Sequence, residues 1–154
     1  MSLLVAQYQS LFADPEYQSA SEVAILANTS AFLNEMLSDI NWVGFYLWQP
    51  ERQQLEVGPF QGKIACSTIA SGTGVCGTAF HHQKVQIVPD VHQFAGHIAC
   101  DSATNSEIVV PLTSENGQKL GVLDIDSPIK NRFQDDDATE LVALGQALVK
   151  LLAD

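Results

Sequence analysis

Residues 106–127 read SEIVVPLTSENGQKLGVLDIDS, and this stretch decides the fold. Two apolar runs flank Asn116-Gly117, and an Asn-Gly pair between such runs is a strong signal for a β-hairpin. A two-residue Asn-Gly loop pairs Glu115 with Gln118 and fixes the register of both strands. The sequence therefore predicts an antiparallel hairpin here.

The segments before this hairpin predict helices followed by a second hairpin. A helix is expected up to about Ala13, and Asp14-Pro15 then has the pattern of an N-cap followed by a first-turn proline. Apolar residues recur at helical spacing from Val23 to Ile40. Beyond them NWVGFYLW (41–48) alternates with period two, and QLEVGPF (54–60) reads as the returning strand.

The middle of the chain is rich in glycine and predicts short elements. A short helix is expected around Val75–His82, a short strand at Val85–Val88, and a loop with at most one helical turn over about 90–106. The segment 133–154 predicts a helix whose N-terminal acids complement the helix dipole. Its expected buried stripe is Leu141, Leu144, Leu148 and Leu151.

This order of elements predicts an α+β domain with a mostly antiparallel sheet. We expect one domain over residues 1–154, with helices in 1–40, the sheet and the loops of the site in 41–130, and a C-terminal helix in 133–153. The terminal helices would cover one face of the sheet. The middle loops would cap the other face, over a ligand cavity.

The composition narrows the class of ligand. The net charge is −11, from 18 acidic and 7 basic residues, and 46% of the residues are hydrophobic. Such a chain, without a Lys/Arg cluster, is repelled by nucleic acid and by anionic membranes, so neither is an expected partner. No apolar stretch is long enough to span a membrane, and the N-terminus lacks a signal-peptide pattern. We expect a cytoplasmic protein that handles small, neutral or amine-bearing ligands.

The three cysteines, Cys66, Cys76 and Cys100, are odd in number and do not indicate a disulfide framework. They could be buried apolar residues, metal ligands or redox thiols. A zinc site is disfavoured because there is no C-x-x-C, and His97-x-x-Cys100 is a single weak pair. We expect no metal and no cofactor, and we expect the histidines to be solvent-facing loop residues.

A glycine motif in the middle of the chain offers another interpretation, which we reject. Residues 72–77 match G-x-G-x-x-G, with Asp90 downstream as in dinucleotide sites. The helix that follows is only about two turns long, too short for a typical crossover between parallel strands, and the rest of the chain indicates hairpins. These glycines are expected to let a loop turn tightly into a short helix.

Acidic residues gather at the end of the second hairpin. By strand alternation Leu120, Val122, Asp124 and Asp126 share one face, and the hairpin register places Glu107 opposite Asp126. Either the strand ends there and the carboxylates meet water, or the acids form one cluster that lines a pocket.

Two aromatic residues and one cysteine are further candidates. Trp42 and Tyr46 share a strand face, as core aromatics or as a wall for an apolar or cationic ligand group. Cys100 lies seven residues before Glu107 and is followed directly by Asp101, with no Lys or Arg nearby in sequence. Acidic neighbours oppose thiolate formation, so from the residues alone Cys100 is either inert or a nucleophile in acidic company.

Four segments carry a family resemblance. They are NWVGFYLW (41–48), GPFQGKIACSTIASGTGVCGTAF (58–80), VPDVHQFAGHIACDSATNSEIVVPL (88–112) and LGVLDIDSP (120–128). Together they closely resemble the free methionine-(R)-sulfoxide reductases, small enzymes built on the GAF fold. The resemblance runs from about residue 20 to the C-terminus and includes all three cysteines, so it implies a GAF-like fold and this activity.

The resemblance implies a role for each cysteine. Cys100 matches the nucleophile of the family, Cys66 the cysteine that resolves it by forming a disulfide, and Cys76 a third cysteine with an accessory role. The matching reductant is thioredoxin. Dimers through terminal helices are common among GAF domains, so a homodimer is among the expectations.

The resemblance also places the candidate substrate-binding residues. Glu107, Asp124 and Asp126 match the acidic substrate site, and Trp42 and Tyr46 match its aromatic wall. Reduction of a sulfoxide needs a sulfur nucleophile and a proton for the departing oxygen, and crowded buried acids favour one protonated carboxyl. We expect Glu107 or Asp126 to be that acid.

The resulting expectation is an oxidoreductase that reduces free L-methionine (R)-sulfoxide through a sulfenic acid on the nucleophilic cysteine and an intramolecular disulfide. Its substrate partner would be free methionine sulfoxide, whose ammonium group pairs with the buried acids. The alternatives are a GAF-type module that binds a small molecule and a redox sensor without turnover.

Overall fold

The computed structural model describes residues 2–97 and 100–152. Within them lies a six-stranded sheet of order β3-β2-β1-β6-β5-β4, and all neighbouring strands are antiparallel. The strands are β1 (Trp42–Gln49), β2 (Gln54–Gly62), β3 (Thr68–Ala70), β4 (Gln86–Val88), β5 (Ser106–Thr113) and β6 (Lys119–Ser127). The helices are α1 (Leu3–Phe12), α2 (Pro15–Gln18), α3 (Glu22–Met36), α4 (Gly74–His82), the 3-10 helix η1 (Val91–Gln93) and α5 (Asp135–Leu152). The α+β prediction is confirmed.

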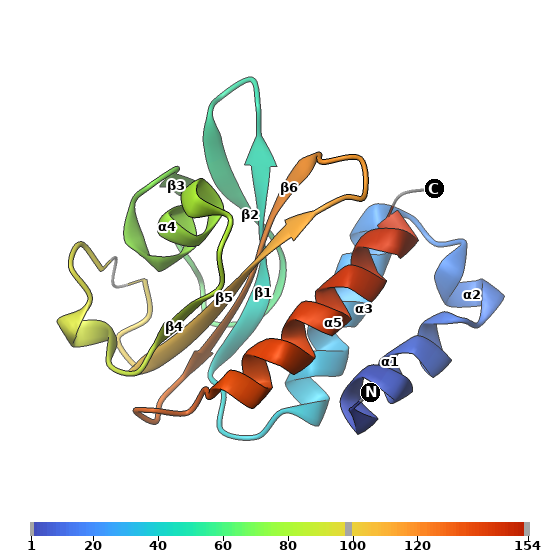
Figure 1. The fold of residues 1–154 in the computed structure, drawn as a ribbon, viewed down its shortest axis with the longest axis horizontal. Coiled ribbons are helices and arrows are strands. Elements are labelled where there is room, and N and C mark those ends of the chain that lie inside the picture. Colours follow the sequence, from blue (N-terminus) through green and yellow to red (C-terminus); the bar gives the residue numbers. More distant parts are fainter. Residues whose placement is uncertain (1, 98–99, 153–154) are drawn as a thin grey trace.

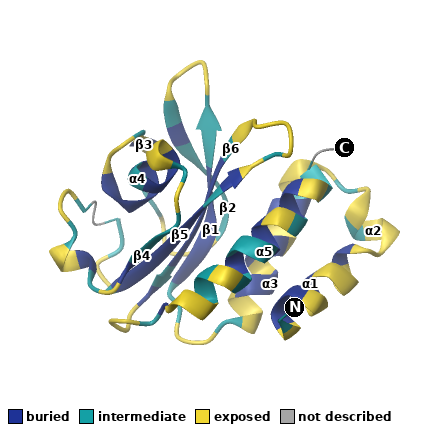
Figure 2. Cartoon of the chain, viewed as in Figure 1, coloured by how far each residue is buried: buried dark blue, intermediate teal, exposed yellow. Residues whose placement is uncertain are grey.

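The two faces of the sheet carry different layers, as Figure 1 shows. Helices α3 and α5 lie against one face, which we call the helix-covered face, and α1 packs against α5 on the side away from the sheet. The buried residues of α5 belong to the apolar cluster of this face (Figure 2). Helix α4 and the loops around it lie against the other face, which we call the site face. The predicted division between terminal helices and middle loops is confirmed. Among the described helices, none is both long and apolar enough to cross a membrane.

The N-terminal region differs from the prediction at one break. Asp14 caps α2, but that helix ends at Gln18, and α3 starts at Glu22 with Ser21 as its cap. The Ser21 hydroxyl accepts a hydrogen bond from Ala24 N (3.2 Å), which is the bond that favours a new helix start over a continued one. The single helix expected after Asp14 is therefore two helices, and Ile40 lies beyond both.

The β5–β6 hairpin has the predicted register but a different loop. Glu107 pairs with Asp126 as expected. At the turn Ser114 N donates to Gln118 O (2.9 Å), so the closing pair brackets three residues rather than the predicted two. A β-bulge beside the turn restores the register along the rest of the ladder.

The same bulge changes the face of one residue. Leu120 packs against the helix-covered face, whereas Val122 lies in the cluster on the site face. The prediction that Leu120 shares a face with Val122, Asp124 and Asp126 is therefore wrong for Leu120. Strand alternation holds only while both strands advance together, and the bulge interrupts that advance.

The site face is built from short elements. Helix α4 and strand β4 lie where they were predicted, and η1 supplies the helical turn in the following loop. Strand β3 was not predicted, because three residues are too few to show alternation. The glycines before α4 form the expected tight turn: Gly72 N donates to Gly77 O (2.8 Å), and Gly72 and Gly74 have φ of 86° and 63°.

Candidate active site

A pocket opens on the site face between the sheet, the first turn of α4 and the loop that contains Cys100. Its walls combine aromatic, acidic and sulfur-bearing side chains from segments far apart in sequence. The lining residues with aromatic, ionisable or sulfur-bearing side chains include Trp42, Tyr46, Cys76, His97, Cys100, Glu107, Asp124 and Asp126. Of the residues predicted for the site, all but Cys66 line this one pocket.

The three predicted acids form one cluster. Glu107 and Asp124 are 6% and 5% exposed, and Asp126 is partly buried. Burial raises the pKa of the Glu107 carboxyl well above its usual range, and repulsion from Asp124 and Asp126 raises it further. Burial likewise raises the pKa values of Asp124 and Asp126. The alternative in which these carboxylates simply meet water is wrong, because Glu107 and Asp124 are buried and α4 packs over β5 and β6.

Two carboxylate oxygens of this cluster are free to bind a ligand. Asp124 Oδ1 and Asp126 Oδ1 are buried, and within the described residues neither accepts a hydrogen bond. A buried polar atom without a partner costs free energy, so a donor group that enters the pocket gains by pairing with it. A cationic donor fits best, since it also relieves the repulsion among the acids.

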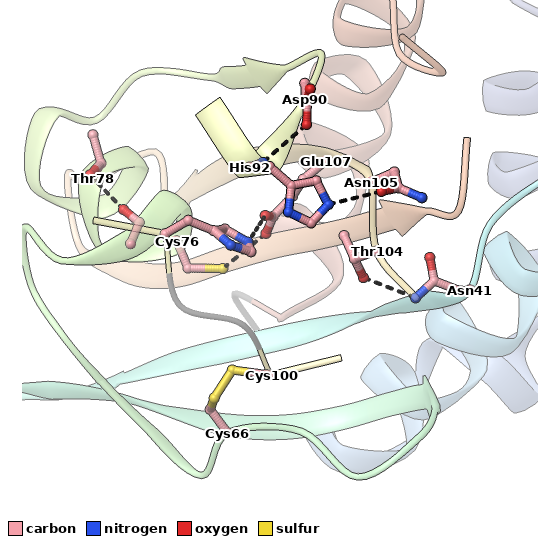
Figure 3. Close-up of polar contacts among 12 residues, drawn as sticks. Asn41, Cys66, Cys76, Thr78, Asp90, His92, Cys100, Thr104, Asn105 and Glu107 are labelled. Carbon is pink, nitrogen blue, oxygen red and sulfur yellow. Dashed lines mark hydrogen bonds and ion pairs between the residues drawn. A yellow bond between two sulfur atoms is a disulfide. The ribbon is translucent and has the colours of Figure 1, made fainter. Parts of the chain in front are cut away.

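The cysteines separate into a bonded pair and a buried thiol. Cys66 and Cys100 are joined by a disulfide, with Cα atoms 5.5 Å apart. Figure 3 shows Cys76 apart from this bond and beside Glu107, with 4.0 Å between Cys76 Sγ and Glu107 Oε2. Burial and the neighbouring carboxylates raise the pKa of the Cys76 thiol, which keeps it protonated and a poor nucleophile. The accessory role assigned to Cys76 stays a prediction.

Trp42 and Tyr46 belong to the hydrophobic core of the site face and also form a wall of the pocket. Both are buried in the site-face cluster, with ring centroids 5.8 Å apart, and both line the pocket. Their polar ends reach the segment that leads to Cys66. Trp42 Nε1 donates to Lys63 O (3.2 Å), and Tyr46 Oη donates to Cys66 O (3.1 Å). The two aromatic residues therefore hold the backbone beside the disulfide as well as the pocket wall.

His97 is a pocket residue that the sequence did not reveal. The expectation of solvent-facing loop histidines is wrong for it, because its side chain lines the pocket, with Nε2 4.0 Å from Glu107 Oε1. Burial lowers the pKa of His97, and nearby His92 lowers it further, so the neutral ring is favoured. His81 and His82 are exposed but lie in the last turn of α4 rather than in a loop.

Asn41 is a second residue that was missed. Its Nδ2 donates to Asp101 Oδ2 and to Thr104 Oγ1, both at 3.0 Å, and these contacts are drawn in part in Figure 3. Asn41 thereby ties the start of β1 to the segment that follows Cys100. It also turns the Asp101 carboxylate toward an amide donor. No pattern in the sequence links residues sixty positions apart in this way.

A possible cation site combines Cys76, which was weighed as a zinc ligand, with two acids that were not. Ligand atoms of Cys76, Glu107 and Asp124 all lie within 4.8 Å of one another. Cys66 and Cys100 cannot serve as thiolate ligands while they are joined to each other. Any metal at this point would use the carboxylates that also face the pocket.

Comparisons with known proteins give the family. A family model described as a GAF domain matches residues 19–153. The free methionine-R-sulfoxide reductase of Escherichia coli is 57% identical over 133 residues, which cover 86% of this chain and 79% of that protein. The chain belongs to the free methionine-(R)-sulfoxide reductase family. These proteins are oxidoreductases on the GAF fold, so the expected fold and family are confirmed.

Solved structures of this reductase family superpose closely on the chain. The reduced form of fRMsr of Staphylococcus aureus is 50% identical, with a TM-score of 0.89, and the match covers 98% of this chain and 94% of that one. The Neisseria meningitidis free methionine-R-sulfoxide reductase in complex with its substrate is 42% identical, also with a TM-score of 0.89, over 97% of this chain and 86% of that one.

Proposed function

We propose that this protein reduces free L-methionine (R)-sulfoxide to L-methionine, with Cys100 as the nucleophile. One observation carries the proposal: Cys100 lines the same pocket as two buried acids and one partly buried acid, and the pKa values of all three are raised. A sulfur that attacks and an acid that protonates are the two groups that sulfoxide reduction needs.

The reaction runs in two steps on the enzyme. In the first, the Cys100 thiolate attacks the sulfoxide sulfur, the sulfoxide oxygen is protonated and passes to Cys100, and the products are methionine and a Cys100 sulfenic acid. In the second, the Cys66 thiol attacks the sulfenic sulfur, water leaves and the Cys66–Cys100 disulfide forms. The disulfide in the structure is the expected end of this sequence.

Glu107 is the acid we assign to the first step. It is buried, its pKa is raised by burial and by both neighbouring aspartates, and the Cys76 thiol and the neutral His97 ring lie beside it. A carboxyl in this setting holds its proton to a higher pH than an exposed one and can deliver it to the oxygen. Asp126 pairs with it across the hairpin and is the alternative donor.

The substrate's ammonium group is the cation that suits the free oxygens of Asp124 and Asp126. A peptide-bonded methionine lacks this charge and would leave those carboxylates uncompensated, which favours the free amino acid.

The first turn of α4 lines the same pocket, and its N-cap Thr73 makes no side-chain cap bond. The free backbone N–H groups there suit the substrate carboxylate. The S-methyl group fits against the ring of Trp42.

Recycling uses a thioredoxin-type dithiol, which reduces the disulfide and restores both thiols. Such a reductant belongs to a reducing compartment, in keeping with the expected cytoplasmic location. The homodimer stays a prediction.

The test is a turnover assay with free and peptide-bound methionine sulfoxide side by side, with dithiothreitol as reductant. We expect consumption of the free substrate and little of the peptide, and no turnover by Cys100→Ser, because the attacking sulfur is gone. Cys76→Ser is the matched control and should still turn over. Full activity in Cys100→Ser would overturn the assignment.

The disulfide is also what a redox sensor would form. That alternative predicts that peroxide oxidises Cys100 while sulfoxide is not consumed.

A further inference from the structure

A second hollow lies on the outer side of the disulfide. It is lined by Gly62, Lys63, Ile64, Cys100, Asp101 and Ser102. Cys100 lines both this hollow and the substrate pocket, whereas Cys66 lines neither of the two. Cys100 therefore lies between the substrate pocket and the surface hollow.

An apolar side chain stands at the rim of this hollow. Ile64 is 91% exposed, which is the highest exposed fraction among the large apolar side chains of the described residues. Leu3 follows at 74%. Its backbone is nevertheless fixed, because Trp42 holds Lys63 O on one side and Tyr46 holds Cys66 O on the other. A held loop that presents an isoleucine to solvent beside a disulfide is typical of a contact surface rather than of a frayed segment.

One basic side chain at the hollow can meet an incoming thiolate. Lys63 is exposed and makes no ion pair within the part of the chain that the structure describes, whereas the Asp101 carboxylate accepts bonds from Asn41 Nδ2 and Ala103 N. The hollow is therefore lined by one basic and one acidic residue, and the Lys63 ammonium is the group that can pair with an acidic partner surface. A positive charge stabilises thiolates and attracts an acidic partner surface.

We propose that this hollow is the docking site of the protein dithiol that recycles the enzyme, with Ile64 as its apolar anchor, and that the partner attacks Cys100. The inference rests on the proposed function and names the partner's surface and target. In the first exchange the partner's thiolate bonds to Cys100 Sγ, the Cys66–Cys100 bond breaks and Cys66 leaves as a thiolate that takes up a proton. In the second, the partner's other thiol attacks its own bonded sulfur, which releases Cys100 and oxidises the partner to a disulfide.

The first experiment compares Ile64→Glu with Val23→Glu, a matched control at a 67% exposed position on α3, in the layer over the opposite face of the sheet. Turnover is driven either by thioredoxin, with its reductase and NADPH, or by dithiothreitol. We expect Ile64→Glu to raise the KM for thioredoxin about tenfold, the loss typical of an interface anchor, with dithiothreitol-driven turnover unchanged. Val23→Glu should behave like the wild type with both reductants.

The outcomes separate the two proposals. No turnover of methionine sulfoxide by the wild type with dithiothreitol would reject the proposed function itself. Normal dithiothreitol turnover, together with an unchanged KM for thioredoxin in Ile64→Glu, would reject the docking site alone.

The second experiment identifies the sulfur that is attacked. A thioredoxin that lacks its second active-site cysteine cannot complete the exchange and stays bonded to its target. We expect mass spectrometry of this trapped complex, formed from the oxidised wild-type enzyme, to find the partner on the peptide of Cys100. A partner bonded to Cys66 would overturn the assigned direction of attack.

Discussion

The two faces of the sheet use the same strands for opposite purposes. On the helix-covered face β1 and β6 present Phe45, Leu123 and Ile125, which are fully buried in an apolar cluster with α1, α3 and α5. On the site face the same two strands present Tyr46 and Asp124, in a layer that also holds a thiol and a disulfide. Apolar burial on both faces contributes to the free energy of folding, and the site face also contains groups that destabilise the fold and carry the chemistry.

Buried acids are tolerated on the site face because apolar packing on the helix-covered face stabilises the same strands. Each of these carboxyls is moved away from water, and burial raises the pKa of all three. The apolar packing of the helix-covered face offsets this cost. The comparison predicts that substitutions on one face change activity and substitutions on the other change stability.

The largest expected effect is on the site face. Glu107→Gln keeps the shape of the side chain but removes the proton donor, so kcat should fall roughly 10²- to 10⁴-fold, as for a lost general acid. The denaturation midpoint should not fall, since an uncharged amide of the same shape replaces a buried carboxyl whose ionisation costs free energy. Glu115→Gln, at an exposed position in the β5–β6 loop, is the control and should leave both quantities unchanged. Wild-type turnover in Glu107→Gln would contradict the assignment of Glu107 as the proton donor on the site face.

A pair of neighbours on β1 tests the same division by stability. Phe45→Ala opens a cavity on the helix-covered face and should lower the free energy of unfolding by about 3–5 kcal/mol. Tyr46→Phe, one residue on but facing the site, removes only the bond to Cys66 O and should cost about 1 kcal/mol. Urea denaturation measures both, and rapid-mixing assays should show slower disulfide formation only in Tyr46→Phe. Equal losses of stability would contradict the comparison.

The smallest expected effect is a gradual change in how the free energy of unfolding depends on pH. Glu107 has a raised pKa in the folded protein and an ordinary value near 4.5 when unfolded, so above that pH the folded state binds more protons. Its contribution to stability is present below pH 4.5 and is lost as pH rises through the raised pKa. Glu107→Gln lacks this titration, while Asp124, Asp126, Cys76 and His97 still face the position.

The free energy of unfolding of Glu107→Gln should therefore increase relative to that of the wild type as pH rises from 4.5. Urea midpoints measured at successive pH values would show it, with Glu115→Gln parallel to the wild type as the control. Parallel curves for all three proteins would mean that Glu107 titrates normally in the folded state.

The sequence by itself determined the two hairpins, the strand β4 and most of the residues that share a strand face, Leu120 excepted. These follow from local rules: alternation in 41–48 places Trp42 and Tyr46 together, and the Asn-Gly signal predicts the hairpin that pairs Glu107 with Asp126, although a bulge beside the turn is needed for this register. The family resemblance added the pairing of Cys66 with Cys100, which the structure contains.

Only the tertiary structure decided what surrounds those faces. It buried the acids, moved Leu120 to the other face through a bulge, and brought His97, Asn41 and Lys63 to the site from loops without a local signal. Side-chain period is a property of a single strand and can be read from its residues. Burial and pKa depend on which distant segments pack over that strand, and local sequence patterns do not fix this.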